Sequence, residues 1–147
     1  MKIGRLRYPQ FRLADAAQQT VGGFLLAGPF VVTEEVWVLA SNMSHLQAFM
    51  VVCVTAGIGY AALYEADTGR DPDAEQEVVG VPLRFLSLML VSFGSVALLA
   101  MLVDAPDTFV ETYPNGSMIR TIEVTIKAVS VGSVFSVVGA ATADSLL

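Results

Sequence analysis

The feature that most constrains this chain is a run of 19 residues without a single charge, "FLSLMLVSFGSVALLAMLV", at positions 85–103. At about 1.5 Å per residue, a helix of this run is about 28 Å long and matches a hydrocarbon core of about 30 Å. A second uncharged run, "LQAFMVVCVTAGIGYAALY", covers 46–64. Membrane β-strands need only about 9–11 residues and an alternating polar face, which both runs lack. The two runs therefore predict membrane-spanning α-helices.

Composition extends this prediction to the whole chain. Of the 147 residues, 54% are hydrophobic and 15% are charged, against about 25% charged residues in a soluble domain. The mean hydropathy of +0.64 agrees with this. Two further apolar segments flank the uncharged runs. We predict one all-α integral membrane domain, a bundle of four transmembrane helices at 20–40, 46–64, 84–103 and 120–141, with a basic N-terminal tail at 1–19.

The distribution of lysine and arginine predicts the orientation, because these residues accumulate in cytoplasmic loops. With the N-terminus inside, the tail contributes four and the 65–84 link contributes Arg70 and Arg84, whereas the opposite side receives only Arg120. We therefore expect a multi-pass protein of the plasma membrane with both termini cytoplasmic. Glycosylation-type triplets at Asn42 and Asn115 fall on the outer side so close to span ends that chance occurrence is favoured.

The charge balance excludes some functions. There are 14 acidic and 8 basic residues, a net charge of −6, and phosphate binding needs clustered lysine and arginine, so we expect no nucleic acid partner. An acidic, lysine-poor surface suits a halophilic source, with ordinary acidic loops as the alternative. The single cysteine, Cys53, cannot form an internal disulfide or a multi-cysteine metal site. With His45 as the one histidine, no catalytic or metal-binding constellation exists, and we expect neither an enzyme nor a cofactor.

Small residues spaced about four apart predict how the helices pack. Transmembrane helices associate by close backbone approach, because lipid tails are as apolar as leucine side chains. Such seams can also join protomers, so we expect a homo-oligomer in addition to the lipid bilayer as a partner. Proline inside the first span should kink it. The residues predicted to set the packing are Gly23, Ala27, Pro29, Gly57, Ala61, Gly94, Gly132 and Ser136.

Two adjacent glutamates, Glu34 and Glu35, interrupt the first apolar segment. A span over 14–32 would leave both at the outer interface. A span over 21–40 would bury both in the outer half, would exclude the glutamines before it, and would place Trp37 near the headgroups, where tryptophan is favoured. We prefer the second placement. A carboxylate in lipid costs about 2.5–3.5 kcal/mol on insertion scales and therefore needs a partner or a proton.

The last span carries a possible partner. Arg120, Glu123, Lys127 and Ser130 follow one another at spacings of three and four and so form a polar stripe on one helical face. Counted from the outer end, Lys127 and Glu35 lie at similar depths, about 10 Å and about 8 Å at 1.5 Å per residue. The alternative is that Glu123 and Lys127 pair with each other and that both glutamates are interfacial.

The stretch "GGFLLAGPFVVTEEVWVLA" (22–40) resembles a family of uncharacterised integral membrane proteins of bacteria and halophilic archaea. That family carries a proline followed by Thr-Met-Glu-Val-Trp-Trp in the first span. Pro29, Thr33, Glu35, Val36 and Trp37 match, whereas glutamate stands in place of the methionine and valine in place of the second tryptophan. The resemblance implies a short multi-span protein of unknown function with Glu35 as its signature carboxylate.

Two functions fit these observations. One is a small transporter or channel subunit for protons or monovalent cations, in which an intramembrane carboxylate titrates or binds the ion. The other is a non-catalytic structural or accessory membrane protein that oligomerises through its small-residue seams. Under the first, the ion-binding or titrating candidates are Glu35, Glu34, Thr33, Lys127 and Glu123.

Overall fold

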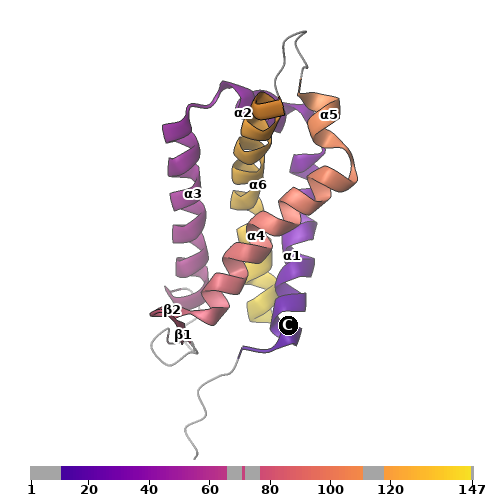
Figure 1. Cartoon of the computed structure of the whole chain (residues 1–147). Helices are drawn as coiled ribbons and strands as arrows, with labels where there is room; N and C mark the ends of the chain where they lie inside the picture. Colours follow the sequence, from indigo (N-terminus) through magenta and orange to yellow (C-terminus); the bar gives the residue numbers. More distant parts are fainter. Residues whose placement is uncertain (1–10, 66–70, 72–76, 111–117, 147) are drawn as a thin grey trace, which may run out of the picture.

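The computed structural model describes residues 11–65, 71, 77–110 and 118–146, and these residues are predominantly helical (Figure 1). Two short strands form an antiparallel hairpin that pairs Glu77 with Pro82, and its turn residues Val79 and Gly80 have positive φ. In chain order the elements are α1 (Leu13–Val31), α2 (Glu34–Asn42), α3 (His45–Tyr60), the π-helical η1 (Ala61–Glu65), β1 (Glu77–Val78), β2 (Val81–Pro82), α4 (Leu83–Leu102), α5 (Ala105–Phe109) and α6 (Met118–Leu146).

Three helices within the described part of the chain are long and apolar enough to cross a membrane: α3 with its η1 continuation, α4 and α6. The pair α1 and α2 passes the same test when taken together, but it is bent by 80°. The chain is thus an all-α integral membrane protein. The bounds of α3 with η1 and of α4 lie within one residue of the second and third predicted spans, whereas α6 extends five residues beyond the predicted end of the fourth.

The first span differs from the prediction. A single helix over 20–40 was expected, but α1 begins at Leu13 and ends at Val31, and the chain then turns into α2. The placement over 14–32 is therefore the one that matches α1. The earlier start has a physical reason, since Asp15 and Gln19 are buried and face other helices rather than lipid. Pro29 lies on the exposed side of α1, within its last turn.

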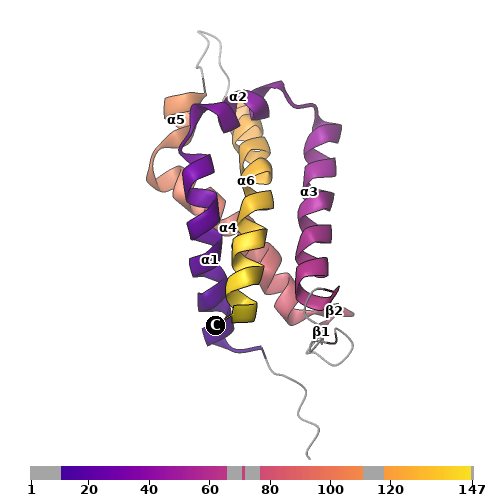
Figure 2. The ribbon, with the colours of Figure 1, turned by 180° about the vertical axis from the view of Figure 1, so that it is seen from behind.

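Helix α6 is the centre of the bundle, and it lies between α1 and α3 in both views (Figures 1 and 2). Of its apolar window, 61% of the residues are buried, against 28% for α4 and 17% for α3. Helix α4 crosses the bundle obliquely, from the foot of α3 to α5 near the top of α1. The least hydrophobic of the three long helices is thus the one with the most protein around it.

The bundle has two ends, which we name after residues of α6. At the Asp144 end α1 begins and α6 finishes, so the N-terminal and C-terminal helices start and stop together; at the Lys127 end α2 lies across the bundle (Figure 1). Several positions used to predict orientation and glycosylation lie outside the described residues, namely 1–10, Arg70 and Asn115.

The predicted packing residues divide into two groups. Gly23 lies against the hydroxyls of Ser136 and Ser95, and Gly132 lies against Val96, so these positions do mediate close helix contacts. Ala27 and Ser136 are fully buried. By contrast, nothing described lies within 4 Å of a Cβ built on Gly57 or Gly94. Gly57, Ala61, Gly94 and Pro29 lie on the outer surface of the bundle, where packing against a second protomer stays a prediction.

Candidate functional site

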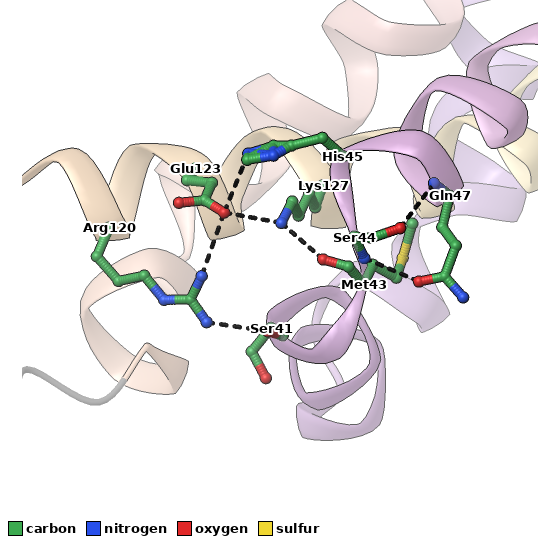
Figure 3. Close-up of polar contacts among 8 residues, drawn as sticks. All are labelled: Ser41, Met43, Ser44, His45, Gln47, Arg120, Glu123 and Lys127. Atoms are coloured by element: carbon green, nitrogen blue, oxygen red, sulfur yellow. Dashed lines mark hydrogen bonds and ion pairs between the residues drawn. The ribbon is translucent and has the colours of Figure 1, made fainter.

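Glu123 is the centre of a polar cluster at the Lys127 end (Figure 3). One of its carboxylate oxygens, Oε1, accepts hydrogen bonds from Lys127 Nζ at 2.8 Å and from Arg120 Nη1 at 3.3 Å. The Nε2 atom of His45, at the start of α3, lies 3.4 Å from the same oxygen. Three residues of α6, spaced three and four apart, therefore share one face and form a connected set of charges.

The two cations of this cluster also hold the end of α2 in place. Arg120 Nη2 donates to the carbonyl of Ser41 at 2.9 Å, and Lys127 Nζ donates to the carbonyl of Met43 at 2.6 Å. The last carbonyls of a helix lack partners within the helix and carry a partial negative charge, so cations stabilise them. This explains how Lys127, whose side chain is 6% exposed, is accommodated in the bundle.

The structure therefore shows the alternative pairing at Lys127, in which it bonds Glu123 rather than Glu35. The candidate contact between Lys127 and Glu35 does not form, because Glu34 and Glu35 occupy the first turn of α2 and both are exposed. Carboxylates in the first turn of a helix are favoured by its dipole and by its unpaired N–H groups. The two glutamates therefore begin helix α2 and do not lie inside one continuous first span.

The stretch that resembles the known family forms the corner between α1 and α2. Thr33 Oγ1 donates to the carbonyl of Phe30 at 2.8 Å, and Trp37 Nε1 donates to the carbonyl of Val31 at 2.9 Å. Both carbonyls belong to the last turn of α1, where no helical partner follows. Val36 and Trp37 are buried beside them. The matched residues Thr33, Val36 and Trp37 therefore build the corner.

A second charged cluster lies at the Asp144 end, and it joins three helices. Arg84 Nη1 of α4 donates to Asp144 Oδ1 of α6 at 2.7 Å, and Arg84 Nη2 donates to Asp15 Oδ2 of α1 at 3.5 Å. All three residues are at most 7% exposed. The Arg84 guanidinium also lies 5.4 Å from the ring centroid of Phe11. Since buried charges require partners, this cluster fixes where the three helix ends meet.

This cluster was not predicted from the sequence. Asp15 was assigned to the tail, Arg84 served only to predict orientation, and Asp144 lay beyond the last predicted span. The sequence does contain one signal. A charged residue stands at the end of each of three apolar runs, and three such residues can meet if these ends lie at the same level of the bilayer. No spacing rule within one helix reveals such a set, because its members are 60 and 69 residues apart.

Between the two charged clusters, the interior of the bundle is lined by small polar groups. Thr55 Oγ1 of α3 lies 3.0 Å from Ser133 Oγ of α6, and Ser87 Oγ of α4 donates to Gln19 Oε1 of α1 at 2.8 Å. Further along α6, Ser130 and Ser136 are also buried. Polar residues in a membrane helix are expected to face other helices or a wet interior rather than lipid.

Two atoms of this interior have no hydrogen-bond partner among the described residues: Gln19 Nε2 and Ser136 Oγ. Both residues are 0% exposed. Buried polar atoms are normally paired, and those without a protein partner are commonly satisfied by an ordered water. The Ser136 hydroxyl faces Gly23 of α1, where an added Cβ would approach it to 2.9 Å. The interior of the bundle therefore contains two polar groups whose hydrogen-bonding capacity is not satisfied by the described residues.

Comparison of the sequence with known protein families gives a match over almost the whole chain. Residues 6–144 match the family described as "Putative integral membrane protein (DUF2391)". The chain belongs to the DUF2391 family. The match covers every helix described above except the last residues of α6, so the bundle and both charged clusters fall inside the family domain. Neither the comparison with curated proteins nor that with solved structures yields a match.

Proposed function

We propose that this integral membrane protein is a small transporter of protons or monovalent cations, and that its pathway follows the polar face of α6. The observation that carries the proposal is the pair of buried, unpartnered polar atoms, Gln19 Nε2 and Ser136 Oγ, between two charged clusters. Groups of this kind recruit water or an ion into an interior that would otherwise be dry. The carboxylates assigned to the pathway are Asp144 and Asp15, in place of Glu35.

The dimensions of α6 support this route. From Lys127 to Asp144 the helix rises about 25 Å at 1.5 Å per residue, close to the thickness of a hydrocarbon core of about 30 Å. The charged clusters therefore lie near the two borders of the bilayer. Ser130, Ser133 and Ser136 occupy the intervening face and are buried. Hydroxyl groups both donate and accept hydrogen bonds, as proton relay requires, and their oxygens are ligands for hard cations.

The charge of the protein favours cations over anions. The chain has a net charge of −6, and a surface of one sign raises the local concentration of counter-ions. At the Asp144 end two buried carboxylates share the guanidinium of Arg84. The two carboxylates attract a proton or a cation and repel an anion.

Flux measurements in reconstituted vesicles test the pathway. We expect the wild type to conduct protons or a monovalent cation, and Ser136→Ala to lower that flux about tenfold, the effect of losing one interaction of about 1.4 kcal/mol in the barrier. The hydroxyl of Ser136 has no described partner, so the variant should fold normally. Asp144→Asn should lower flux at least as much, with thermal stability recorded alongside.

Glu35→Gln is the matched control, because Glu35 is an exposed carboxylate on α2. Its flux should remain within about twofold of wild type, since exposed charges far from the pathway contribute little. An absence of flux in the wild type would overturn the transport proposal. Flux that responds to Glu35→Gln but not to Ser136→Ala would move the pathway away from α6.

A second candidate function is that of a structural or accessory protein that self-associates. A specific observation favours it. Cys53 and Gly57 of α3 and Ala61 at the start of η1 follow one another at four-residue spacing and are exposed, and this span is the least buried of the three candidate spans among the described residues. Exposed small residues allow close approach of a second helix in the membrane. We propose α3 as the contact between protomers of a homo-oligomer.

The single cysteine allows a direct test of this contact. We expect oxidation of the wild type in bilayers to give a covalent dimer through Cys53, because disulfides require Cα atoms within about 7 Å. Gly57→Leu should abolish the dimer by holding the helices apart. A Cys53→Ser/Val54→Cys variant, with the thiol at a neighbouring exposed position, is the control and should cross-link poorly. If Cys53 gives no dimer in bilayers, or cross-links no better than this control, α3 is not the interface.

A further inference from the structure

A pocket of about 630 Å³ opens at the Lys127 end, where α2, α5 and α6 meet. Sites for small ligands commonly have volumes of about 300–1,000 Å³. The pocket is lined by residues near the start of α6, and neither Ser136 nor Gln19 is among its lining residues. Its lining includes Glu34, Trp37, Asn42, Thr108, Phe109 and Arg120.

The floor of the pocket is rigid and apolar. Trp37 and Phe109 stack with ring centroids 6.1 Å apart, and buried Val110 and Val124 lie beside them. The indole of Trp37 is fixed in place because its Nε1 donates to the carbonyl of Val31. A floor of this kind removes water from a bound group and strengthens the charge contacts made around it.

Two opposite charges line the same pocket without neutralising each other. Arg120 uses Nη1 for Glu123 and Nη2 for Ser41, so three of the five donors of its guanidinium have no partner within the described residues. Its side chain is 43% exposed. Glu34 is exposed and forms no hydrogen bond or ion pair with any residue that the structure describes. A cation with spare hydrogen-bond donors and an anion without a described partner thus border one cavity.

We propose that this pocket binds a small zwitterion, with its anionic group at Arg120 and its ammonium group at Glu34. A simple anion would be repelled by Glu34, and a simple cation by Arg120, so a molecule with both charges fits the pair best. The anionic group is a phosphate or a carboxylate, which guanidinium binds through parallel N–H donors. The carbon chain between the two charges lies over Trp37. This assignment stands apart from the proposed transport function.

This chemistry has two sources, a free solute and the phosphoethanolamine headgroup of a lipid. The full-length protein in detergent would be titrated with phosphoethanolamine and glycine as free zwitterions, and with dihexanoyl phosphatidylethanolamine as the lipid. Calorimetry measures the binding. The fluorescence of Trp37, the single tryptophan, reports whether the ligand lies at this pocket. Ethanolamine, inorganic phosphate and dihexanoyl phosphatidylglycerol, which carry charge of one sign only, are the comparison ligands.

We expect saturable binding of at least one zwitterion, with Glu34→Gln and Arg120→Gln each weakening it about tenfold or more, the worth of one charge-assisted contact of about 1.5–3 kcal/mol. Glu35→Gln removes the neighbouring carboxylate, which does not line this pocket, and should leave affinity unchanged. Arg120→Lys keeps the cation and the fold, and should retain part of the affinity.

The source follows from which ligand binds. Binding of free phosphoethanolamine or glycine identifies a solute site, whereas binding of the lipid alone identifies a headgroup site. The proposal fails if no zwitterion binds, if single-charge analogues bind equally well, or if Glu35→Gln weakens binding as much as Glu34→Gln. A failure here leaves the flux results for Ser136 unaffected, because Ser136 does not line this pocket.

Discussion

Replacing Gly22 by alanine should reduce the free energy of unfolding by about 3 kcal/mol or more, the upper range for overpacking of a well-packed interior. Gly22 of α1 meets Gly139 of α6 backbone to backbone, and an added Cβ would overlap the Gly139 carbonyl. A backbone group cannot move aside as a flexible side chain can. The two helices must separate along their whole contact. Unfolding by SDS titration in micelles measures the loss.

Gly57→Ala and Gly94→Ala are the matched controls. Both glycines lie in helices, and nothing described lies within 4 Å of the added Cβ. Alanine is favoured over glycine inside a helix by about 1 kcal/mol, so these variants should be neutral or slightly more stable. An equal loss of stability at Gly22 and Gly57 would contradict the contact between α1 and α6.

The second large effect is expected at Arg84. Arg84→Gln should destabilise the bundle by about 3–5 kcal/mol, the usual cost of removing one partner of a buried ion pair. The loss arises because Asp15 and Asp144, both 6% exposed, are left buried without the guanidinium that compensates them. Thermal unfolding in detergent measures the change, with helix content followed by circular dichroism.

Two comparisons separate this effect from a general loss of positive charge. Arg12 also lies 3.8 Å from Asp15, but its side chain is 73% exposed, so Arg12→Gln should cost less than about 1 kcal/mol. The triple variant Arg84→Gln/Asp15→Asn/Asp144→Asn removes all three charges together. It should recover most of the stability lost in Arg84→Gln. If Arg12→Gln and Arg84→Gln are equally destabilising, the cluster is not held by buried charge.

The membrane helices could be predicted from hydropathy because most residues of α3 and α4 lie on the surface of the bundle. Leu90 and Leu98 of α4 and Phe49 of α3 are largely exposed, and a lipid-facing residue must be apolar. Helix α6 gave the weakest apolar signal for the opposite reason. Its serines, Glu123 and Lys127 face protein, so hydropathy underestimates the helix that is most enclosed.

The first span was misplaced by the same rule. Polar residues near the start of the span predict that this part lies outside the bilayer. In the structure, however, Gln19 bonds Ser87 and Asp15 bonds Arg84. Partners on other helices are invisible in one sequence. The sequence left two placements of the glutamates open, because the corner that exposes them depends on Thr33 and Trp37 capping the last carbonyls of α1.

The candidate site could be predicted in part. The stripe of Arg120, Glu123 and Lys127 follows from helical periodicity, and the internal pairing of Glu123 with Lys127 follows from their four-residue spacing. Contacts with the carbonyls of Ser41 and Met43 could not be anticipated, because backbone groups carry no sequence signature. The same holds for the pocket, whose walls come from three separate helices.

The central place of α6 sets the order in which the protein can assemble. Helix α6 follows α1, α3 and α4 in the chain, so these three enter the membrane before the helix on which they pack has left the ribosome. Until then Thr55 and Arg84 lack their α6 partners Ser133 and Asp144, and their polar groups must be shielded by water, lipid headgroups or an insertion factor. The bundle can therefore be completed only when α6 inserts among helices that are already in the membrane.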